Sequence, residues 1–417
     1  MLKRCLFIAF LSVLLAGCDN VENDNKKKER QDIILSRSEE NVVNSEIDFS
    51  FKFISDLYNT NLKENGESMS NILVSPLSLF QDCSMLANGG SSNYQESAFG
   101  FLNLTDDATI NSLNSFNDRI VRELSVADKS VDFSISNSLW VHNTVGLKQS
   151  FVNNISEFYN ATTGSLDFNS RNAVDKINSW SNSSTKGMIP KIFEYGQLNS
   201  DNVFALCNAI YFKGQWSDNI LADNTENRFF YSQNGNKPLV ATMNSGCNGV
   251  YFGDDLTVVK KDYGNRAYSI YFVLPDDGVS LQTVMSELNR ESWENIKSNL
   301  NYNSWKIRFP KFRIEYDMDL VGREVVEALG LKEILLNPDL SEMTDDNIGN
   351  LKFIQKNTFE VDESGAKAAT SSVFTGDPTC AMPSDPLTPI DINRPFMFLI
   401  EEYSTGTILF AGTISNL

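Results

Sequence analysis

Residues 361–370 have the pattern of a strand that leads into a run of small side chains, and this segment constrains the fold more than any other. Successive residues of a strand face opposite sides of a sheet, so alternate residues share one face. Because an inserted strand must bury one face, small residues at alternate positions would let the segment pass between two existing strands. The small residues of one parity are Ala366, Ala368, Thr370 and Ser372. Proline cannot donate to a sheet ladder, so the prolines that begin at Pro378 end the insertable part near Asp377.

The overall composition predicts a globular protein that does not bind nucleic acid. The chain has 417 residues, and 41% of them are apolar, which is enough to form a large core. Lys and Arg number 35 against 54 Asp and Glu, giving a net charge of −19. Such a surface would repel a polyanion.

The N-terminus has the pattern of an export signal. Lys3 and Arg4 precede an apolar run at 6–15, and the sequence Leu-Ala-Gly then leads to Cys18. This last pattern resembles the bacterial lipoprotein box, which implies removal of 1–17 and a lipid on Cys18. The expected location is the bacterial cell envelope, at the outer membrane or cell surface. The alternative is an ordinary signal peptide that happens to precede a cysteine.

Residues 18–46 are rich in Asn, Asp, Glu, Lys, Arg and Ser, which predicts a flexible tether without a core of its own. The folded domain is then expected at 47–417. Apolar residues recur every four positions at Phe49, Phe53 and Leu57, which predicts a helix with Asp48 as its N-cap.

Farther along the chain, the patterns predict an α+β fold in a single domain. Helical patterns dominate the first half and strand patterns the second, with no alternation of strand and helix. A helix is expected from Leu320 to Leu329, ending at Gly330. The predicted strands are residues 131–141, 268–274 and 305–309, together with a terminal hairpin of 396–400 and 408–411.

The sequence contains little that could support catalysis. His142 is the only histidine, and it follows a predicted strand in what should be a turn. A hydrolase would need His142 beside a serine and an acid. No phosphate-binding loop and no cluster with metal-ligand spacing is present in the sequence, so neither an enzyme, a metal nor a cofactor is predicted.

The cysteines are not expected to form a structural disulfide. Cys83 and Cys207 lie in apolar surroundings that suit buried thiols, whereas Cys380 lies among prolines and polar residues and should be exposed.

A series of short motifs in the chain resembles those of the serpin family, in the family's order, from about residue 48 to the C-terminus. No single motif identifies the family, but the whole series in the same order does. They are 71–78 (Asn-Ile-Leu-Val-Ser-Pro-Leu-Ser), 177–180 (Ile-Asn-Ser-Trp) with 185–189 (Thr-Lys-Gly-Met-Ile), 208–216 (Asn-Ala-Ile-Tyr-Phe-Lys-Gly-Gln-Trp), 309–312 (Phe-Pro-Lys-Phe), 328–331 (Ala-Leu-Gly-Leu), 361–370 and 393–396 (Asn-Arg-Pro-Phe).

The resemblance implies a monomer with three sheets, about nine helices and an exposed reactive loop. A target protease would cleave that loop and form a covalent acyl-enzyme. The loop would then enter the main sheet as a new strand, a mechanism of strand insertion for which serpins are themselves the established example. The hinge residues implied are Glu363, Gly365, Ala366, Ala368, Ala369, Thr370 and Ser372.

Family spacing places the cleaved bond at Thr379–Cys380, fourteen residues after Gly365, a length of roughly 46 Å at about 3.3 Å per residue. Counting back from 393–396 instead allows a site nearer Met382 or Ser384. No Lys or Arg lies between Lys367 and Arg394, which favours an elastase-like serine protease or a papain-like cysteine protease over a trypsin-like one.

The resemblance also implies a set of residues that control opening of the main sheet: Ser75, Ser78, Asn208, Trp216 and Gln355. Gln355 replaces the family's histidine and is expected to meet Ser75 and Asn208, since its amide can both donate and accept. Lys367 replaces the usual glutamate, but its parity keeps it off the small-residue face. The alternative function is that of a non-inhibitory serpin, a binding or carrier module.

Overall fold

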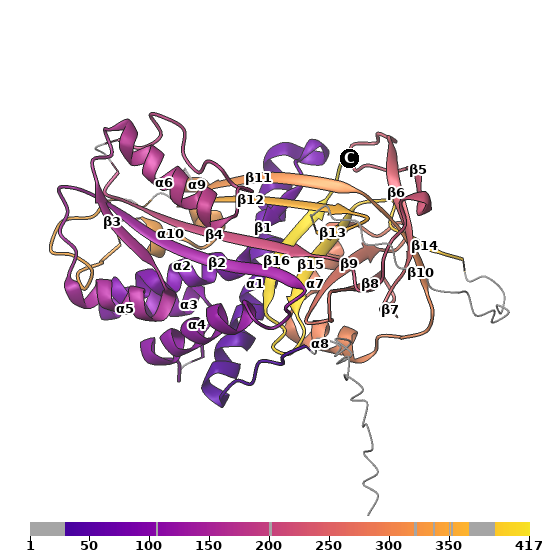
Figure 1. Cartoon of the computed structure of the whole chain (residues 1–417), viewed down its shortest axis with the longest axis horizontal. Helices are drawn as coiled ribbons and strands as arrows, with labels where there is room; N and C mark the ends of the chain where they lie inside the picture. The colour runs from indigo at the N-terminus through magenta and orange to yellow at the C-terminus, as the bar shows by residue number, and fades with distance from the viewer. Residues whose placement is uncertain are drawn as a thin grey trace, which may run out of the picture.

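The computed structural model of the chain describes residues 30–105, 107–199, 202–320, 323–336, 338–349, 351, 353–366 and 388–417 (Figure 1). These residues form three β-sheets and a set of helices, which confirms the predicted α+β class.

We call the first of the three sheets the main sheet. Its strands follow the order β11-β12-β4-β2-β3, and the short β13 pairs with β12. The alternating apolar side chains of β2 face the core, as predicted, and its register with β4 runs from Val131 opposite Gly214 to Val141 opposite Phe204. The strands are β2 (Val131–His142), β3 (Thr162–Leu166), β4 (Phe204–Gly214), β11 (Phe312–Leu320), β12 (Phe353–Asp362) and β13 (Gly365–Ala366).

A second sheet, the core sheet, contains the predicted buried strand and the predicted terminal hairpin. It has the order β1-β16-β15-β9-β8-β7. All residues of β9 and β15 are buried, because helices or the main sheet cover both faces. Its strands are β1 (Ile72–Val74), β7 (Gly249–Phe252), β8 (Leu256–Tyr263), β9 (Tyr268–Pro275), β15 (Phe396–Glu402) and β16 (Ile408–Ile414).

A third sheet, the small sheet, lies at the right-hand end of the molecule in Figure 1 and has the order β14-β10-β6-β5. β14 is the first strand after the undescribed segment 367–387, and it pairs in parallel with β10 through Ile390 and Ile307. The strands are β5 (Thr225–Phe229), β6 (Leu239–Gly246), β10 (Lys306–Pro310) and β14 (Ile390–Asp391).

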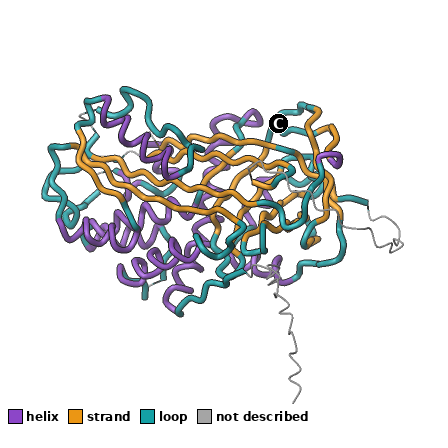
Figure 2. The backbone as a smooth tube through the Cα atoms, in the orientation of Figure 1, coloured by secondary structure: helices purple, strands orange, loops and turns teal. Residues whose placement is uncertain are grey.

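Helices cover both faces of the main sheet. Figure 2 shows most of them gathered beneath one face, whereas α6 lies on the other. The alternation of β4 matches this arrangement, because Leu206 packs into the large core and Cys207 into a smaller cluster with α6. The α-helices are α1 (Arg37–Asn65), α2 (Pro76–Gly89), α3 (Ser92–Phe101), α4 (Ile110–Leu124), α5 (Gln149–Tyr159), α6 (Arg171–Ser184), α7 (Leu281–Glu287), α8 (Arg290–Ser298), α9 (Arg323–Ala328) and α10 (Lys332–Leu335), and the 3₁₀ helices are η1 (Gly66–Ser68) and η2 (Ala222–Asn224).

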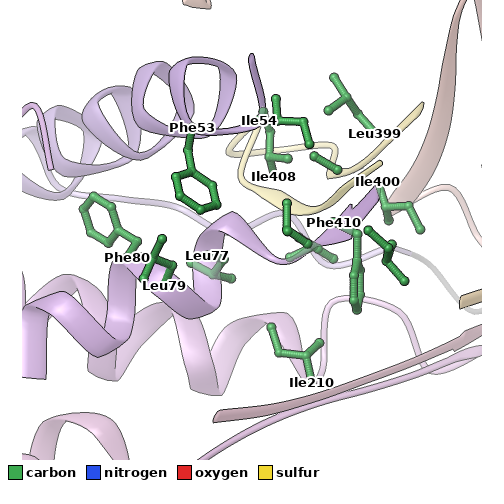
Figure 3. Close-up of a cluster of buried hydrophobic side chains, with 14 of the residues drawn as sticks. Phe53, Ile54, Leu77, Leu79, Phe80, Ile210, Leu399, Ile400, Ile408 and Phe410 are labelled. Atoms are coloured by element: carbon green, nitrogen blue, oxygen red, sulfur yellow. The ribbon is translucent and has the colours of Figure 1, made fainter. Parts of the chain in front are cut away.

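The large core joins α1, α2 and the core sheet to the underside of the main sheet. Burial of side chains of this size is the main stabilising contribution, at about 1.5–3 kcal/mol for each one fully buried. Figure 3 shows part of the cluster, with Phe53, Ile54, Leu77, Leu79, Phe80, Ile210, Leu399, Ile400, Ile408 and Phe410 labelled.

The start of α1 differs from the prediction. The helix begins at Arg37, and its N-cap is Ser36, which forms a capping box with Glu39, so the predicted cap at Asp48 is wrong. Residues 37–46 of the expected 18–46 tether therefore belong to the folded domain. Val42 and Val43 are buried, and the preceding backbone is held by a bond from Gln31 N–H to the Ala127 carbonyl at 2.9 Å.

Two other expectations are also corrected. β2, α5 and β3 form one strand-helix-strand unit, with β2 and β3 parallel, although the sequence patterns predict no such alternation. The helix predicted from Leu320 begins at Arg323, because β11 extends through Leu320. Its predicted end is confirmed, since Gly330 has a φ of +75°, which favours glycine.

Within the described residues, no helix is both long enough and apolar enough to cross a bilayer. Cys83 and Cys207 are buried free thiols, as their apolar surroundings predicted, and Cys247 is a half-buried free thiol.

Candidate functional site: the hinge and the opening of the main sheet

The chain reverses direction immediately after β12, at the predicted hinge. Glu363 and Ser364 form the turn, and β13 returns antiparallel to β12, with Val361 opposite Ala366 and Asp362 opposite Gly365. Gly365 also forms a β-bridge with Gln215, the residue after β4. The backbone of 365–366 therefore lies between the ends of β12 and β4.

Gly365 fits this position because it has no side chain. Its φ is +114°, a region that other residues rarely adopt. A Cβ atom there would lie 2.1 Å from the carbonyl oxygen of Gly214 and 2.8 Å from Cα of Gln215. The predicted hinge glycine is thus the residue that lets the returning backbone approach β4.

Glu363 fixes the turn to the small sheet. It accepts hydrogen bonds from Thr225 Oγ1 and Lys311 Nζ, both at 2.7 Å. Burial acts to raise the pKa of Glu363, but the bonds from Lys311 and Thr225 outweigh it and hold the pKa below its usual value. Neither Thr225 nor Lys311 is predicted as a partner by the sequence, although Lys311 lies within the 309–312 motif.

Trp216 lies at the same end of the sheet, as predicted. Its indole Nε1 donates to the carbonyl oxygen of Asp362 at 2.8 Å, and its ring stacks on Tyr263 with centroids 4.6 Å apart. Phe309 packs edge-on against the indole at 5.8 Å. The side chain is therefore both a core residue and a direct contact of the hinge backbone.

A buried polar cluster lies near the middle of the main sheet, where Gln355 meets the N-terminus of α2. Gln355 Oε1 accepts from the Ser75 backbone N–H, and Gln355 Nε2 donates to the Ser75 carbonyl, both at 3.0 Å. Asn357 Nδ2 also donates to Gln355 Oε1 at 2.9 Å. The predicted contact with Ser75 is confirmed, and a glutamine amide satisfies it by donating and accepting together.

Asn208 belongs to the neighbouring part of this cluster. Its side chain accepts from Ser78 Oγ at 2.6 Å and donates to Asn137 Oδ1 at 2.5 Å. The expected contact with Gln355 is therefore wrong, because the hydrogen-bond partners of the Gln355 amide are Ser75 and Asn357.

β12 and β4 run in parallel with little backbone pairing between them. In the described part of these strands, they pair only where Phe353 lies opposite Leu206, and Gly365 and Ala366 lie between them at the other end. A strand antiparallel to both β12 and β4 would continue β13 along the edges that these two strands turn toward each other. Figure 1 shows β12 and β4 side by side along this length.

Several of the predicted site residues lie outside the described residues. These are Cys18, Ala368, Ala369, Thr370, Ser372, Thr379 and Cys380. Ala366 is described by its backbone, through its pairing with Val361.

His142 is the last residue of β2 and is not in a turn. Its Nδ1 lies 2.9 Å from Thr144 Oγ1, and its Nε2 lies 4.0 Å from Asp167 Oδ1. The ring is buried and packs edge-on against Phe168. Its hydrogen-bonding partner is thus a threonine of the turn that follows β2, whereas the hydrolase alternative requires a serine nucleophile. Its packing is that of a structural histidine.

Comparison with known proteins agrees with this geometry. The family model "Serpin (serine protease inhibitor)" matches residues 45–417. An uncharacterized serpin-like protein of Thermococcus kodakarensis is 27% identical, covering 100% of this chain and 99% of its own.

Solved structures give the same result. The crystal structure of tengpin, a thermophilic serpin, in its native state has a TM-score of 0.79 and 26% identity, covering 93% of this chain and 96% of that one. Thyroxine-binding globulin in complex with thyroxine has a TM-score of 0.77 and 25% identity, covering 90% of this chain and 98% of that one. The protein therefore belongs to the serpin family, whose members are generally protease inhibitors rather than enzymes.

Proposed function

We propose that this serpin inhibits proteases as a suicide substrate, by inserting its cleaved loop into the main sheet. One observation carries the proposal. The backbone of 365–366 already lies between the ends of β12 and β4, and the described parts of these strands otherwise pair only at Phe353 and Leu206. The next residues along the chain have the alternating small side chains that an inserted strand needs.

In the proposed reaction the nucleophile of the protease attacks the carbonyl carbon of Thr379. The bond to the Cys380 nitrogen breaks, the new amine takes up a proton, and Thr379 remains bound to the protease as an acyl group. Insertion of the released loop then carries the acylated protease along the sheet before water can hydrolyse the acyl bond. The inserted strand would extend from β13, so the turn at Glu363, bound to Thr225 and Lys311, would stay in place and set the starting point of that strand.

The loop composition supports an elastase-like serine protease or a papain-like cysteine protease as the target, because no Lys or Arg lies between Lys367 and Arg394. We also propose that the chain is monomeric and tethered to the bacterial envelope by a lipid on Cys18, on the strength of the Leu-Ala-Gly-Cys pattern.

A second candidate function is that of a ligand carrier, which the similarity to thyroxine-binding globulin supports. Carrier members of the family have charged or bulky residues, or proline, on the inserting face. Ala366, Ala368, Thr370 and Ser372 are small, which favours inhibition over carriage.

The test is incubation of residues 30–417 with pancreatic elastase, subtilisin and papain, followed by denaturing gels and mass spectrometry of the released peptide. An inhibitor gives a complex with the serine proteases that survives denaturant, and a peptide that begins at Cys380. Clean cleavage without any complex would instead support the carrier.

A pair of loop variants makes the test specific for insertion. Thr370→Arg places a guanidinium on the face that insertion buries, so this variant should be cleaved without forming a complex, because burying an unpaired charge is strongly unfavourable. Ser371→Arg adds the same charge on the opposite face and should inhibit normally. Equal inhibition by the two variants would contradict strand insertion with this parity.

A further inference from the structure

The outer hairpin of the small sheet carries an exposed apolar patch. Phe229, at the end of β5, is 54% exposed, and Leu239, at the start of β6, is 61% exposed. The two residues lie directly opposite each other in the β5–β6 register and so share one face. Tyr231, at 47% exposed, follows in the connecting segment, and we call these three side chains the hairpin patch.

The hairpin patch is held on a well-anchored support. Phe230, between Phe229 and Tyr231, is buried and packs against Phe396 of the core sheet, with ring centroids 6.4 Å apart. Its backbone N–H donates to the Pro238 carbonyl at 3.0 Å, which closes the hairpin. The apolar side chains are therefore presented to solvent by a fixed backbone, so their exposure is not explained by a loose loop.

The hairpin also contacts the chain on both sides of the reactive loop. Thr225, the first residue of β5, donates to Glu363, which precedes the loop. On the other side, Tyr231 N–H donates to the Asn393 carbonyl at 2.8 Å, and Arg228 lies 3.6 Å from Asp391 of β14. The described residues that flank segment 367–387 on both sides therefore contact this hairpin.

We propose that the hairpin patch is a docking surface for the target protease, contacting the rim of the protease outside the cleft that receives the loop. The inference rests on the proposed function. Contiguous exposed apolar patches mark interaction sites, and tyrosine is among the residues enriched where interface binding energy is concentrated. The partner it fits is an elastase-like protease with apolar side chains around its cleft. Contacts of this kind would stabilise the encounter before the loop is cleaved.

The test compares the rate at which pancreatic elastase and subtilisin cleave the loop of the wild-type chain and of Phe229→Thr/Leu239→Thr. Threonine keeps the strand propensity of both positions. We expect the double variant to lose its loop roughly tenfold more slowly, with an unchanged thermal unfolding temperature. A free peptide of residues 367–388, added to each reaction, reports the activity of the protease itself. It should be cleaved at the same rate in the wild-type and double-variant reactions.

Tyr195→Thr is the matched control. Tyr195 is 55% exposed and bonds to Asp175 of α6, at the opposite end of the molecule from β5 and β6 in Figure 1. This variant should be cleaved at the wild-type rate. Equal rates for the wild type and the double variant would overturn the docking surface.

The cleavage rate and the fate of the protease are separate results. If the wild type forms no stable complex, the proposed function fails, but slower cleavage of the double variant would still support docking. β5 is an edge strand of its sheet, so a second copy of the chain is the competing occupant. A wild-type dimer that the double substitution converts to a monomer in sedimentation would overturn the proposal.

Discussion

At the scale of single residues, the site depends on side chains that cannot be substituted without a steric clash or a lost hydrogen bond. Gly365 approaches the backbone of β4 too closely for any side chain, and Gln355 must donate and accept at once. Glu46, away from the hinge, is a carboxyl group buried entirely within α1. Each of these residues gives a substitution with a defined physical consequence.

Replacing Gly365 with alanine should destabilise the folded hinge by about 1–2 kcal/mol, the usual cost of a left-handed backbone for a residue with a Cβ, with the clash at Gly214 added. Urea unfolding and hydrogen exchange at Ala366 measure the effect. Gly146→Ala is the control, since a Cβ there meets nothing within 4 Å and should change stability by less than about 0.5 kcal/mol. Equal effects of the two substitutions would argue against the close approach.

Glu46 should make stability depend on pH. Burial raises its pKa to about 8, while its carboxylate accepts from Ser50 Oγ at 2.8 Å and from Ile408 N–H at 3.4 Å. Because the folded pKa lies above the unfolded one, this contribution is fully present below the unfolded pKa and is lost as pH rises toward 8, by up to about 1.4 kcal/mol for each pH unit.

Glu46→Gln removes this titration, so its stability relative to the wild type should increase between pH 5.5 and pH 8.5. Urea unfolding at the two pH values measures the difference. Glu40→Gln, an exposed position on the same helix, should show no such trend. A constant difference between Glu46→Gln and the wild type across this range would contradict a raised pKa.

At the scale of elements, the hinge hairpin joins the main sheet to the small sheet. β13 pairs with β12 of the main sheet, whereas Glu363 bonds to Thr225 of β5 and to Lys311, which follows β10 of the small sheet. The anchor is a partly buried ion pair supported by a second hydrogen bond. The anchor therefore stabilises the turn by a modest free energy.

Lys311→Ala should loosen the hinge without unfolding the domain. A partly exposed ion pair contributes on the order of 1 kcal/mol, so hydrogen exchange at Gly365 and Ala366 should become about fivefold faster. Lys52→Ala, which removes a more exposed pair with Asp56 on α1, is the matched control and should leave exchange at the hinge unchanged. Unchanged exchange in Lys311→Ala would mean that Glu363 does not retain the turn.

At the scale of the whole molecule, the main sheet is short of one strand. In their described parts, its two central strands pair at Phe353 and Leu206 and are bridged at the other end by 365–366. Under the proposed function, the missing pairs would form when the loop enters. A more stable arrangement of the same chain would then be accessible from the fold described here.

Cleavage of the loop should raise the thermal unfolding temperature substantially. Roughly ten new backbone hydrogen bonds at about 1 kcal/mol each would raise the midpoint by roughly 12 °C, at an unfolding entropy of about 2.1 cal/mol/K per residue. Calorimetry before and after limited digestion with papain measures this shift. An unchanged midpoint after verified cleavage would contradict insertion, and the Thr370→Arg chain should show only a small gain.

Much of this arrangement could be predicted from the sequence, because the signals were local. The alternation of Val131, Phe133 and Ile135 predicted β2, and Gly365 at the start of the small-residue run predicted the hinge. The start of α1 was missed, although Ser36 and Glu39 have the spacing of a capping box, because the polar composition of the segment obscured Val42 and Val43.

The remaining contacts depend on register between distant segments. Asn357 donates to Gln355 where both side chains also bond to the backbone of Leu73 and Ser75, which are 280 or more positions away in the sequence. Thr225 and Lys311 meet Glu363 only after the small sheet has docked on the main sheet. Neither set of contacts produces a local sequence pattern. The sequence could therefore indicate Gln355 and Glu363 as site residues but could not predict their hydrogen-bond partners.

The position of Trp216 has a practical consequence. Its indole N–H donates to the carbonyl oxygen of Asp362, the last residue of β12, and its ring lies flat on Tyr263. Movement of β12 away from β4 during the proposed insertion would therefore change the polarity around the indole. In a chain whose other four tryptophans are replaced, the fluorescence of Trp216 would follow that movement in real time without an attached dye.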